Sequence, residues 1–336
     1  MKNVKQHRAV GARIVAIGGG TGLSMLLRGM KHYLANRRHE ISDLAAIVTV
    51  TDDGGSSGRL RREYRVLPPG DIRNCMVALS QDEALLGRLF QYRFHSGRGL
   101  RGHSFGNLFL TALTHVTGDF AEAVRVSSEV LAIRGRIFPA TLENVTLEAV
   151  MKDGKTVSGE THIVSSGKKI RRLRLRPRRV HPLPEVLEAI ARADLILIGP
   201  GSLYTSILPN LLVTGVAEAI ESSSATKVYV ANLMTQPGET EGFSLSDHVR
   251  VIYEHTRRKL FDWVVASKQV VSPEVARRYS AQRAAPVHVD VEKLQTMGVR
   301  CLLDDLLEEH GVVRHDAAHL AQLLVEEFVT SRSGGK

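Results

Sequence analysis

The chain has 336 residues, a formal net charge of +10 and 43% hydrophobic residues, so it can form one large α/β domain or two smaller ones with a sizeable core. Its two cysteines, Cys75 and Cys301, are far apart in sequence, which disfavours a disulfide framework and fits a reducing cytoplasm. The apolar run after residues 1–12 is too short for a signal peptide or a membrane span. We therefore expect a cytoplasmic protein without membrane insertion.

Residues 13–17 form an apolar run that predicts a buried strand, and glycine-rich residues follow it directly, before Leu-rich helical sequence. Glycines allow a sharp turn and a close approach to a ligand, and a helix that begins near Gly22 would point free N–H groups at an anion. We expect a phosphate group to be held here by Gly19, Gly20, Thr21 and Gly22. The dinucleotide fingerprint G-x-G-x-x-G fails at Leu23, and no Walker lysine follows, which disfavours an NAD-dependent oxidoreductase.

A second glycine loop, residues 51–58, follows an apolar run and carries the adjacent carboxylates Asp52 and Asp53. Such a pair at a strand end suits a hard cation such as Mg²⁺ or the hydroxyl groups of a ribose or sugar. Asp, Gly and Ser are also ordinary turn formers, so a solvated turn stays open as an alternative. The position of the loop beside the first glycine loop favours a functional role.

The stretch at residues 68–74 opens the next predicted helix. Its prolines stiffen a loop, and we expect Asp71 to cap the helix that runs through Leu79. Arg73 and Asn74 would then lie on the first turn, where they could reach a ligand.

A further helix is predicted to begin within residues 102–107. His103 and Asn107 could share one face near its N-terminus, whereas a purely structural interpretation has Ser104 as the cap and His103 exposed. The sequence contains no G-x-S-x-G nucleophile elbow, so we do not expect serine hydrolase chemistry.

Residues 136–176 interrupt the alternation of strands and helices and predict an inserted antiparallel β-meander, as a cover or an oligomer contact. Asp153-Gly154 is typical of a type I′ hairpin turn, and Ser166-Gly167 marks a second turn. Near the end of this segment, leucines alternate with Arg172, Arg174 and Arg176, which gives a strand with one basic face. Because no aromatic residues are interleaved, we do not expect this face to bind nucleic acid.

The later chain returns to apolar strands, at residues 195–198, 227–230 and 263–266, each next to an amphipathic stretch. This pattern predicts an α/β fold, with a Rossmann-like, mostly parallel sheet flanked by helices. We assign residues 13–330 to a single nucleotide-binding domain between flexible termini, 1–12 and 331–336. Ligands of such sheets bind at the carboxyl ends of the strands, where residues 199–206 are a candidate for a second anion cradle. We expect Ser202, Thr205 and Ser206 to be its hydroxyl donors, and Gly201 and Ser202 to contact the ligand.

A compact polar triplet, Arg314-His315-Asp316, precedes the last amphipathic helix. Asp316 is expected to cap that helix. Arg314 could pair with a phosphate, although an exposed surface arginine fits the sequence equally well.

The motifs taken together resemble the YvcK branch of the YvcK/CofD-like family, from about Arg13 to about Val329. They are GGGTGL at 18–23, TDDGGSSGRLR at 51–61, PPGDIRN at 68–74, GHSFGNL at 102–108, GPGSLYTSILPNLL at 199–212 and NLMTQPGET at 232–240. The resemblance implies a cytoplasmic gluconeogenesis factor that binds UDP-sugars and supports cell shape and the supply of envelope precursors. It also implies that Gly19 to Gly22 hold phosphate, that Asn74, His103 and Asn107 line the pocket, and that Arg314 is functional.

The related CofD branch implies a competing function, a divalent-metal-dependent 2-phospho-L-lactate transferase in which Asp52 and Asp53 would serve metal and substrate. The sequence does not decide between a non-catalytic UDP-sugar sensor and such a transferase, though it favours the sensor. The sensor would contact an enzyme of envelope precursor synthesis, and we expect a homo-oligomer. No cofactor is required by the sequence, and Mg²⁺ is the metal that the paired carboxylates would take.

Overall fold

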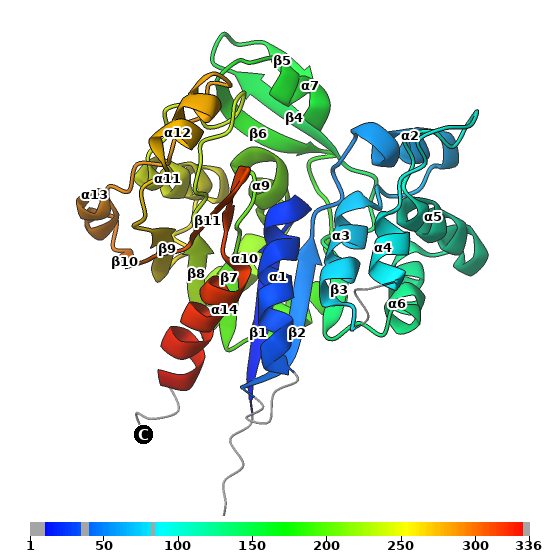
Figure 1. Cartoon of the computed structure of the whole chain (residues 1–336), viewed down its shortest axis with the longest axis horizontal. Coiled ribbons are helices and arrows are strands. Elements are labelled where there is room, and N and C mark those ends of the chain that lie inside the picture. Colours follow the sequence, from blue (N-terminus) through cyan, green and yellow to red (C-terminus); the bar gives the residue numbers. More distant parts are fainter. Residues whose placement is uncertain (1–10, 35–39, 82–84, 332–336) are drawn as a thin grey trace, which may run out of the picture.

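The computed structural model describes residues 11–34, 40–81 and 85–331. Within these residues the main sheet has seven parallel strands in the order β10-β9-β8-β7-β1-β2-β3 (Figure 1). They are β1 (Ala12–Gly18), β2 (Ile41–Val48), β3 (Arg136–Pro139), β7 (Leu195–Ile198), β8 (Thr226–Val230), β9 (Trp263–Ser267) and β10 (Arg300–Asp304). The predicted α/β fold with a mostly parallel sheet is confirmed. Of the predicted flexible termini, residues 1–10 and 332–336 lie outside the described residues, and Ala12 already belongs to β1.

The inner strands β1, β2, β7, β8 and β9 are largely buried on both faces, which explains why their sequences are mostly apolar rather than alternating. In β1, for example, Ile14, Ala16 and Ile17 are fully buried. Over one face of the sheet, α1 (Gly20–Leu34) lies between α3 (Gly70–Leu79) and α14 (Ala317–Val325), as Figure 1 shows. α8 (Pro184–Arg192) and α10 (Val216–Ser222) pack on each other, and α8 contacts β1.

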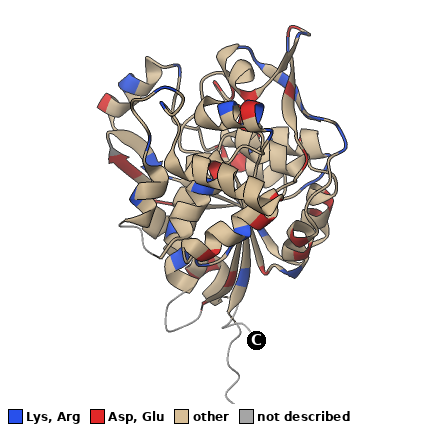
Figure 2. Ribbon diagram, turned by 90° about the vertical axis from the view of Figure 1, so that its right-hand side faces the viewer, with Lys and Arg blue, Asp and Glu red and all other residues tan. Residues whose placement is uncertain are grey.

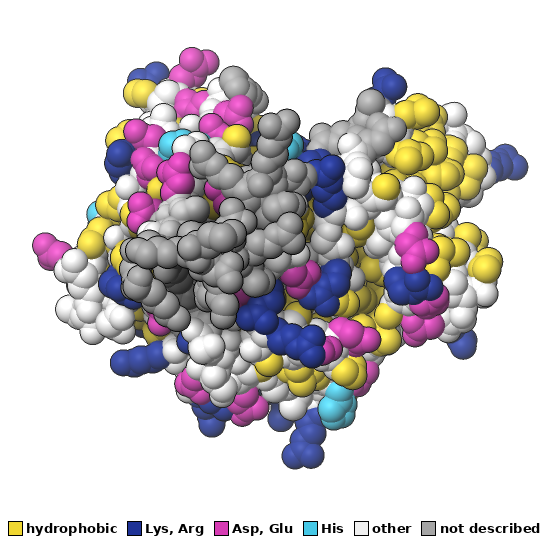
Figure 3. Space-filling model, turned by 90° about the horizontal axis from the view of Figure 1, so that it is seen from below, with side chains coloured by type: hydrophobic (Ala, Val, Ile, Leu, Met, Phe, Trp, Pro, Cys, Tyr) yellow, Lys and Arg dark blue, Asp and Glu magenta, His cyan; other side chains and the backbone are white. Residues whose placement is uncertain are grey.

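A group of helices flanks the β3 edge of the sheet. It consists of α2 (Gly55–Tyr64), α4 (Leu86–Gln91), α5 (Phe105–Thr117) and α6 (Phe120–Val130). Several large apolar side chains on this flank are exposed, including Leu85, Leu89, Val116 and Val130. Figure 3 views the molecule from below and shows hydrophobic surface on the same side.

A small antiparallel sheet lies above the carboxyl edge of the main sheet in Figure 1, with the strand order β5-β4-β6. It contains β4 (Thr146–Met151), β5 (Thr156–Ser158) and β6 (Ile170–Arg176), with the short helix α7 (Glu160–Ser165) between β5 and β6. The predicted boundary near Arg136 is wrong, because residues 136–139 form β3, which pairs in parallel with β2. The residues of a short strand do not by themselves show which sheet the strand joins.

The turn between β4 and β5 also differs from the prediction. Gly154 has φ +84°, but Asp153 does not have a positive φ, so a type I′ turn is not formed. Instead Met151 N and Lys155 O form a hydrogen bond that closes a three-residue loop with its glycine in the left-handed position. The predicted second turn at Ser166-Gly167 lies at the end of α7.

The predicted basic face of β6 is present, because Arg172 and Arg176 are exposed while Leu173 and Leu175 are buried.

The chain after β7 forms η1 (Leu203–Ile207), a π-helical turn, and then α9 (Leu208–Leu211), both within the core. No single helix of the described residues is long and apolar enough to cross a membrane. Two helical segments joined at a bend, Leu203–Leu211 and Val216–Ser222, would together be long and apolar enough, judged by length and composition alone.

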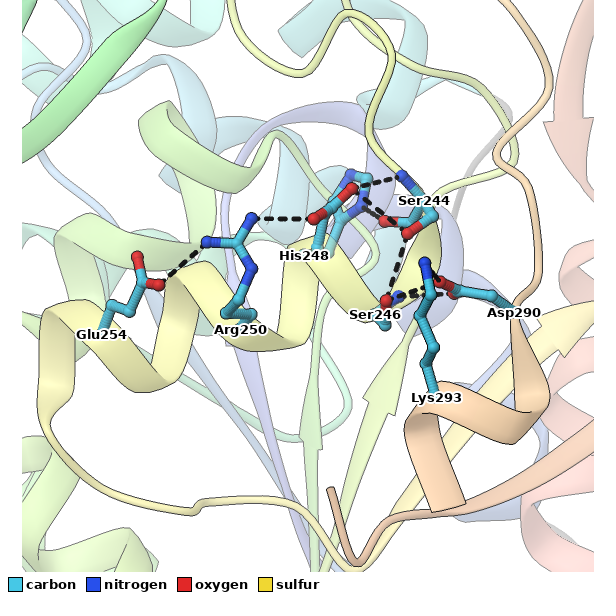
Figure 4. A network of polar contacts seen from close by, with 8 residues as sticks. Ser244, Ser246, His248, Arg250, Glu254, Asp290 and Lys293 are labelled. Carbon is cyan, nitrogen blue, oxygen red and sulfur yellow. Dashed lines mark hydrogen bonds and ion pairs between the residues drawn. The ribbon is translucent and has the colours of Figure 1, made fainter. Parts of the chain in front are cut away.

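α11 (Leu245–Thr256), which follows β8, is fixed at its N-terminus by a polar network (Figure 4). Ser244 and Asp247 form a capping box, and Asp290 accepts hydrogen bonds from Ser246 N at 2.9 Å and Ser246 Oγ at 2.6 Å. Asp290 directly precedes α13 (Val291–Thr296), so these bonds tie α11 to α13.

The chain after β9 continues through α12 (Pro273–Ser280) and, beyond β10, through an antiparallel hairpin of β11 (Leu307–His310) and β12 (Val312–His315). Asp316 then caps α14 by accepting from Ala318 N and His319 N, as predicted. The last described turn is η2 (Glu326–Thr330).

Candidate functional site

The carboxyl ends of β1, β2 and β7 bring three of the predicted loops into contact. After β2, Thr49 N donates to the carbonyl oxygen of Gly18 at 3.0 Å, and Asn210 Nδ2 donates to the same oxygen at 2.9 Å. A Cβ atom on Gly22 would lie 2.4 Å from the carbonyl oxygen of Pro200. Glycine at position 22 is therefore what lets the loops of β1 and β7 pack against each other.

The first glycine loop leaves open space at its tip. Gly20 has φ +63°, and a Cβ there would find just Ser206 Oγ within 4 Å, at 3.8 Å. α1 begins at Gly20, two residues before the predicted position, and Thr21 is exposed. A ligand can therefore approach the N-terminus of α1, where the helix dipole favours an anion.

Asp71 does not cap its helix, contrary to the prediction. α3 begins at Gly70, and Pro69 already has helical backbone angles at the N-cap position, so Asp71 falls inside the first turn. Its carboxyl group turns toward the first glycine loop and accepts a hydrogen bond from the backbone of Gly20. Burial, together with the charge of Asp52, raises the pKa of Asp71 to about 7.

The acidic loop after β2 forms hydrogen bonds within the loop and to the small sheet. Asp52 Oδ1 accepts from Gly54 N at 2.9 Å, which is a local turn bond. Asp53 Oδ1 accepts from both the backbone N and the Oγ1 of Thr161, at 2.9 Å and 2.7 Å. Because Thr161 lies in α7, Asp53 joins the small antiparallel sheet to the carboxyl edge of the main sheet.

Glu160, next to Thr161, adds a further carboxyl group to this edge. Burial and the negative charges of Asp52, Asp71, Glu239 and Asp53, in decreasing order of effect, raise the pKa of Glu160 to about 9. At neutral pH this carboxyl group therefore holds a proton.

The carboxyl groups at this edge bear on whether a metal ion fits here. Within the described residues, no group of three or more His, Cys, Asp and Glu side chains is arranged to hold a metal ion. Mg²⁺ commonly uses one or two carboxylates and completes its shell with phosphate oxygens and water. The charge of Asp52 helps to raise the pKa of Asp71, and a cation between the two would offset that repulsion, so together with a ligand's phosphate groups they fit Mg²⁺.

The loop after β8 braces the loop after β7 through three side chains. Asn232 exchanges two hydrogen bonds with the backbone of Gly201, at 3.1 Å and 2.9 Å. Gln236 Nε2 donates to Ser202 Oγ at 2.7 Å. The buried carboxyl group of Glu239 accepts from Tyr204 N at 3.1 Å and Thr205 Oγ1 at 3.2 Å.

A small pocket opens beside Asn232, between the ends of β8 and β9. Its walls are mostly apolar, with polar side chains contributed by Asn232, Ser267 and Gln269. The pocket therefore adjoins the second anion cradle, because Asn232 also binds Gly201.

The predicted residues of α3 and α5 form a buried network behind the acidic loop. Ser56 Oγ lies 2.9 Å from His103 Nδ1 and accepts from Asn107 Nδ2 at 3.1 Å. Ser104 caps α5 as the structural interpretation predicts, but His103 is 4% exposed, so the exposed position that this interpretation gave it is wrong. Arg73 donates to Ser104 Oγ at 2.5 Å and to Asn74 Oδ1 at 2.6 Å.

Arg314 lies apart from these contacts. It is exposed on β12, opposite Glu308 of β11, and no hydrogen bond or ion pair in the described residues joins it to Gly20 or Ser202. Its neighbour His315 is buried, and the ring Nε2 lies 3.0 Å from the carbonyl oxygen of Ala231 at the end of β8. The hairpin thus packs on the carboxyl edge, while the role of Arg314 stays a prediction.

The fold places three further groups at this edge that were not predicted as site residues: Ser56, Glu160 and Glu239. Ser56 and Glu239 lie inside motifs that were singled out, so a search for hydroxyl and carboxyl groups within those motifs would have found them. Glu160 carries no such signal, because it reaches the site through the folding of the small sheet.

Comparison with known proteins identifies the family of the chain. A family model described as CofD, 2-phospho-L-lactate transferase, matches residues 14–307. The chain belongs to the CofD family.

Relatives cover nearly the whole chain. A protein of Halalkalibacterium halodurans named gluconeogenesis factor is 49% identical over 93% of this chain and 95% of its own length. The gluconeogenesis factor of Bacillus subtilis is 48% identical over 94% of this chain and 97% of its own length. The crystal structure of a UPF0052 family member from Bacillus halodurans has 48% sequence identity and a TM-score of 0.90, and covers 94% of this chain and 99% of that one. The resemblance stated from the motifs is confirmed.

Proposed function

We propose that this chain binds a UDP-sugar, such as UDP-N-acetylglucosamine, at the carboxyl edge of its main sheet and acts as a regulatory gluconeogenesis factor. The observation that carries the proposal is the packing of Gly22 on Pro200, which joins two glycine-bearing strand ends beside the N-terminus of α1. Such a pair of loops suits a diphosphate group. The names of the relatives from Halalkalibacterium halodurans and Bacillus subtilis support the regulatory role.

On this proposal each predicted residue has a place around the ligand. The phosphate groups are held by Gly19, Gly20, Thr21, Gly22, Gly201 and Ser202, and the rest of the site is lined by Asp52, Asp53, Arg73, Asn74, His103, Asn107 and Arg314. The small pocket beside Asn232 adjoins this site, and its apolar walls and amide groups would contact one edge of the base or the sugar.

The cellular role that we propose follows from the same resemblance. The protein would lie in the cytoplasm, as a single domain over residues 13–330, and would form a homo-oligomer. It would contact an enzyme of envelope precursor synthesis and support cell shape during gluconeogenic growth. We do not expect nucleic acid as a partner, because the basic face of β6 carries no aromatic side chains for stacking bases.

A stability screen over nucleotides and nucleotide sugars tests the proposal. At 100 times its dissociation constant, a UDP-sugar should raise the free energy of unfolding by about 2.7 kcal/mol. We expect UDP-sugars to stabilise the protein more than GDP or NAD at equal concentration. Equal thermal stability with and without every UDP-sugar would overturn the proposal.

A second candidate is a divalent-metal-dependent transferase that acts on a phosphorylated small molecule. The electrostatic coupling of Asp71 to Asp52 favours it, because carboxyl groups beside a phosphate site can share Mg²⁺ with the substrate. Incubation with a UDP-sugar and Mg²⁺ separates the two candidates. Saturable binding with the ligand unconsumed supports the regulator, and release of UMP or UDP supports the transferase.

A further inference from the structure

The small sheet carries a concentration of positive charge on its outer face. Residues 168–179 hold eight basic side chains and no acidic one. Of these, Arg172, Arg174 and Arg176 lie at alternate positions of β6 and so share one face of the sheet, where Arg172 and Arg176 are exposed and Arg174 is half-buried. Figure 2 shows basic segments in the upper part of the molecule, where the small sheet lies in Figure 1.

Few carboxylates offset this charge. Arg176 pairs with Glu148 at 3.3 Å, and Lys168 pairs with Asp153 at 2.6 Å. Glu148 is also the residue opposite Arg174 in the pairing of β4 with β6, so one carboxylate lies beside two arginines. Within the described residues, six basic side chains of this stretch form no ion pair: Lys169, Arg171, Arg172, Arg174, Arg178 and Arg179. Because like charges repel one another, the fold gains no stability from keeping them together.

The basic face of β6 is held in place by the opposite side of the strand. Leu173 and Leu175, which alternate with the arginines, are buried. At the edge of β6, Leu173 N donates a hydrogen bond to His255 Nε2 of α11 at 2.9 Å. A partner would therefore meet arginines whose backbone is already ordered, which lowers the entropy that binding costs.

The neighbours of the arginines on this face favour a protein partner over nucleic acid. The pairing of β4 with β5 and β6 places one carboxylate, three hydroxyl groups and one aliphatic side chain there: Glu148, Thr146, Thr156, Ser158 and Val150. None of them is aromatic, so nucleic-acid bases would have nothing to stack on, and Glu148 would repel a phosphate backbone. Charged and hydroxyl side chains are typical of the polar rim of protein interfaces.

A membrane surface also fits this face less well than a protein does. Attachment to a membrane surface commonly combines basic side chains with apolar ones that enter the lipid. Among the residues that the structure describes, none of the exposed large apolar side chains belongs to β4, β5 or β6. Several of them lie on the flank formed by α4, α5 and α6 instead, for example Leu89, Val116 and Val130.

We propose that the basic face of β6 is a docking surface for a partner protein that presents an acidic segment in extended form. Alternate residues of a strand are about 7 Å apart, so carboxylates at every second residue of such a segment match the spacing of Arg172, Arg174 and Arg176. Arginine suits this role, because its planar group can donate two parallel hydrogen bonds to one carboxylate. The surface uses none of the residues assigned to the UDP-sugar site and does not rest on UDP-sugar binding.

A titration on the full-length chain tests the proposal. The probe is a fluorescently labelled, twelve-residue peptide of alternating Glu and Thr, and the comparison ligands are an oligothymidylate of equal net charge and vesicles of phosphatidylglycerol and phosphatidylcholine. We expect the peptide to bind saturably at low salt, with an affinity that falls as salt is added, because the contact is ionic. Absence of saturable peptide binding would overturn the proposal. Tighter binding of the oligothymidylate, or of the vesicles at equal concentration of anionic groups, would overturn it in favour of nucleic acid or a membrane.

Variants locate the binding. Arg172→Gln combined with Arg174→Gln should weaken peptide binding at least tenfold. Arg98→Gln combined with Arg277→Gln removes the same charge from exposed positions elsewhere and should change it less than twofold. Equal affinities of the two double variants would overturn the assignment of the surface. Circular dichroism checks the folding of each variant, and the single variant Arg172→Gln should still weaken binding at least threefold.

Two further measurements separate this surface from the UDP-sugar site. Gly20→Val, in which the glycine loop is blocked, should bind the acidic peptide within twofold of the wild-type affinity. The double variant of Arg172 and Arg174 should bind a UDP-sugar within twofold of the wild-type affinity. Loss of peptide binding in the folded Gly20→Val variant would overturn a docking surface that is independent of that site, whereas absence of UDP-sugar binding in the wild-type protein would overturn the proposed function alone.

Discussion

Thr161 donates two hydrogen bonds to Oδ1 of Asp53, from its backbone N at 2.9 Å and from its Oγ1 at 2.7 Å. These bonds connect α7 of the small sheet to the acidic loop after β2, across more than 100 residues of sequence. They also fix the position of Glu160, the residue before Thr161. The small sheet is therefore part of the edge where the candidate site lies.

Replacing Thr161 tests this connection. Thr161→Val keeps the backbone bond and the shape of the side chain but removes the Oγ1 donor to a charged group, which should cost about 1.5 kcal/mol. Amide hydrogen exchange should speed up in β4–β6 more than in β1 or β7. Thr156→Val, at an exposed position of β5, is the matched control and should leave exchange unchanged. Equal protection in both variants would show that the small sheet is held without Asp53.

The tip of the first glycine loop gives the second prediction. Gly20→Val should abolish UDP-sugar binding, because the branched side chain would fill the space in front of α1. The fold should survive, since a Cβ there meets nothing closer than Ser206 Oγ at 3.8 Å, and the positive φ of +63° costs about 1–2 kcal/mol. Calorimetric titration and circular dichroism measure the two effects. Unchanged affinity in the folded variant would mean that the loop is a turn and nothing more.

A substitution at Gly22 should act differently from one at Gly20. Gly22→Ala would place its Cβ 2.4 Å from the carbonyl oxygen of Pro200, so it should separate the loops of β1 and β7 and lower stability rather than affinity alone.

Some elements of the fold could be predicted from the sequence, and others could not. The parallel sheet was predictable because β1 and β7 are apolar throughout and end in glycine loops. β3 was not, because four residues that end in a proline carry no sign of their neighbour in the sheet. Asp71 looked like a cap because Asp after Pro-Gly is a common helix start, yet the helix begins earlier and its carboxyl group turns to Gly20.

Most of the candidate site could be predicted as motifs but not as contacts. His103 and Asn107 were chosen for their spacing, whereas their shared partner Ser56 comes from another helix. Glu160 depends on the bonds of Thr161, which no local pattern reveals. Long-range contacts of this kind are set by the packing of elements, and a single sequence does not encode them locally.

Arg314 carries the third prediction. Arg314→Ala should weaken UDP-sugar binding by about 1.5–3 kcal/mol, the range for a hydrogen bond to a charged group. Added salt should weaken wild-type binding more than variant binding, because the lost contact is ionic. Titration calorimetry at two salt concentrations measures both, with Arg277→Ala on exposed α12 as the control. Equal affinities at low salt would make Arg314 a surface residue and leave Arg59 and Arg73 as the groups that close the pocket.

The network at α11 gives a prediction on stability and pH. Burial opposes ionisation of Asp290, but hydrogen bonds from the side chain and backbone of Ser246 outweigh it and lower its pKa to about 2. A carboxyl pKa that falls from 3.8 to about 2 on folding contributes about 2 kcal/mol of stability at neutral pH. That contribution is complete above the unfolded pKa and is lost as the pH falls toward 2.

Asp290→Asn should therefore lower the free energy of unfolding by about 2 kcal/mol at pH 7. The difference from wild type should shrink between about pH 4 and pH 2, as the wild-type carboxyl group becomes protonated. Urea denaturation at several pH values measures this, and Glu292→Gln, an exposed carboxyl group nearby, should show neither effect. A difference independent of pH would mean that Asp290 acts through packing rather than through its charge.

We propose above all that the chain binds a UDP-sugar at the carboxyl edge of its sheet without consuming it. Phosphorus NMR of UDP-N-acetylglucosamine, mixed with the protein and Mg²⁺ and followed for several hours, tests binding and turnover together. We predict that both diphosphate signals shift and broaden in proportion to added protein, that Gly20→Val abolishes the effect, and that no new phosphorus signal grows. Diphosphate signals that the protein leaves unchanged, or a growing signal of UMP or UDP, would contradict the account.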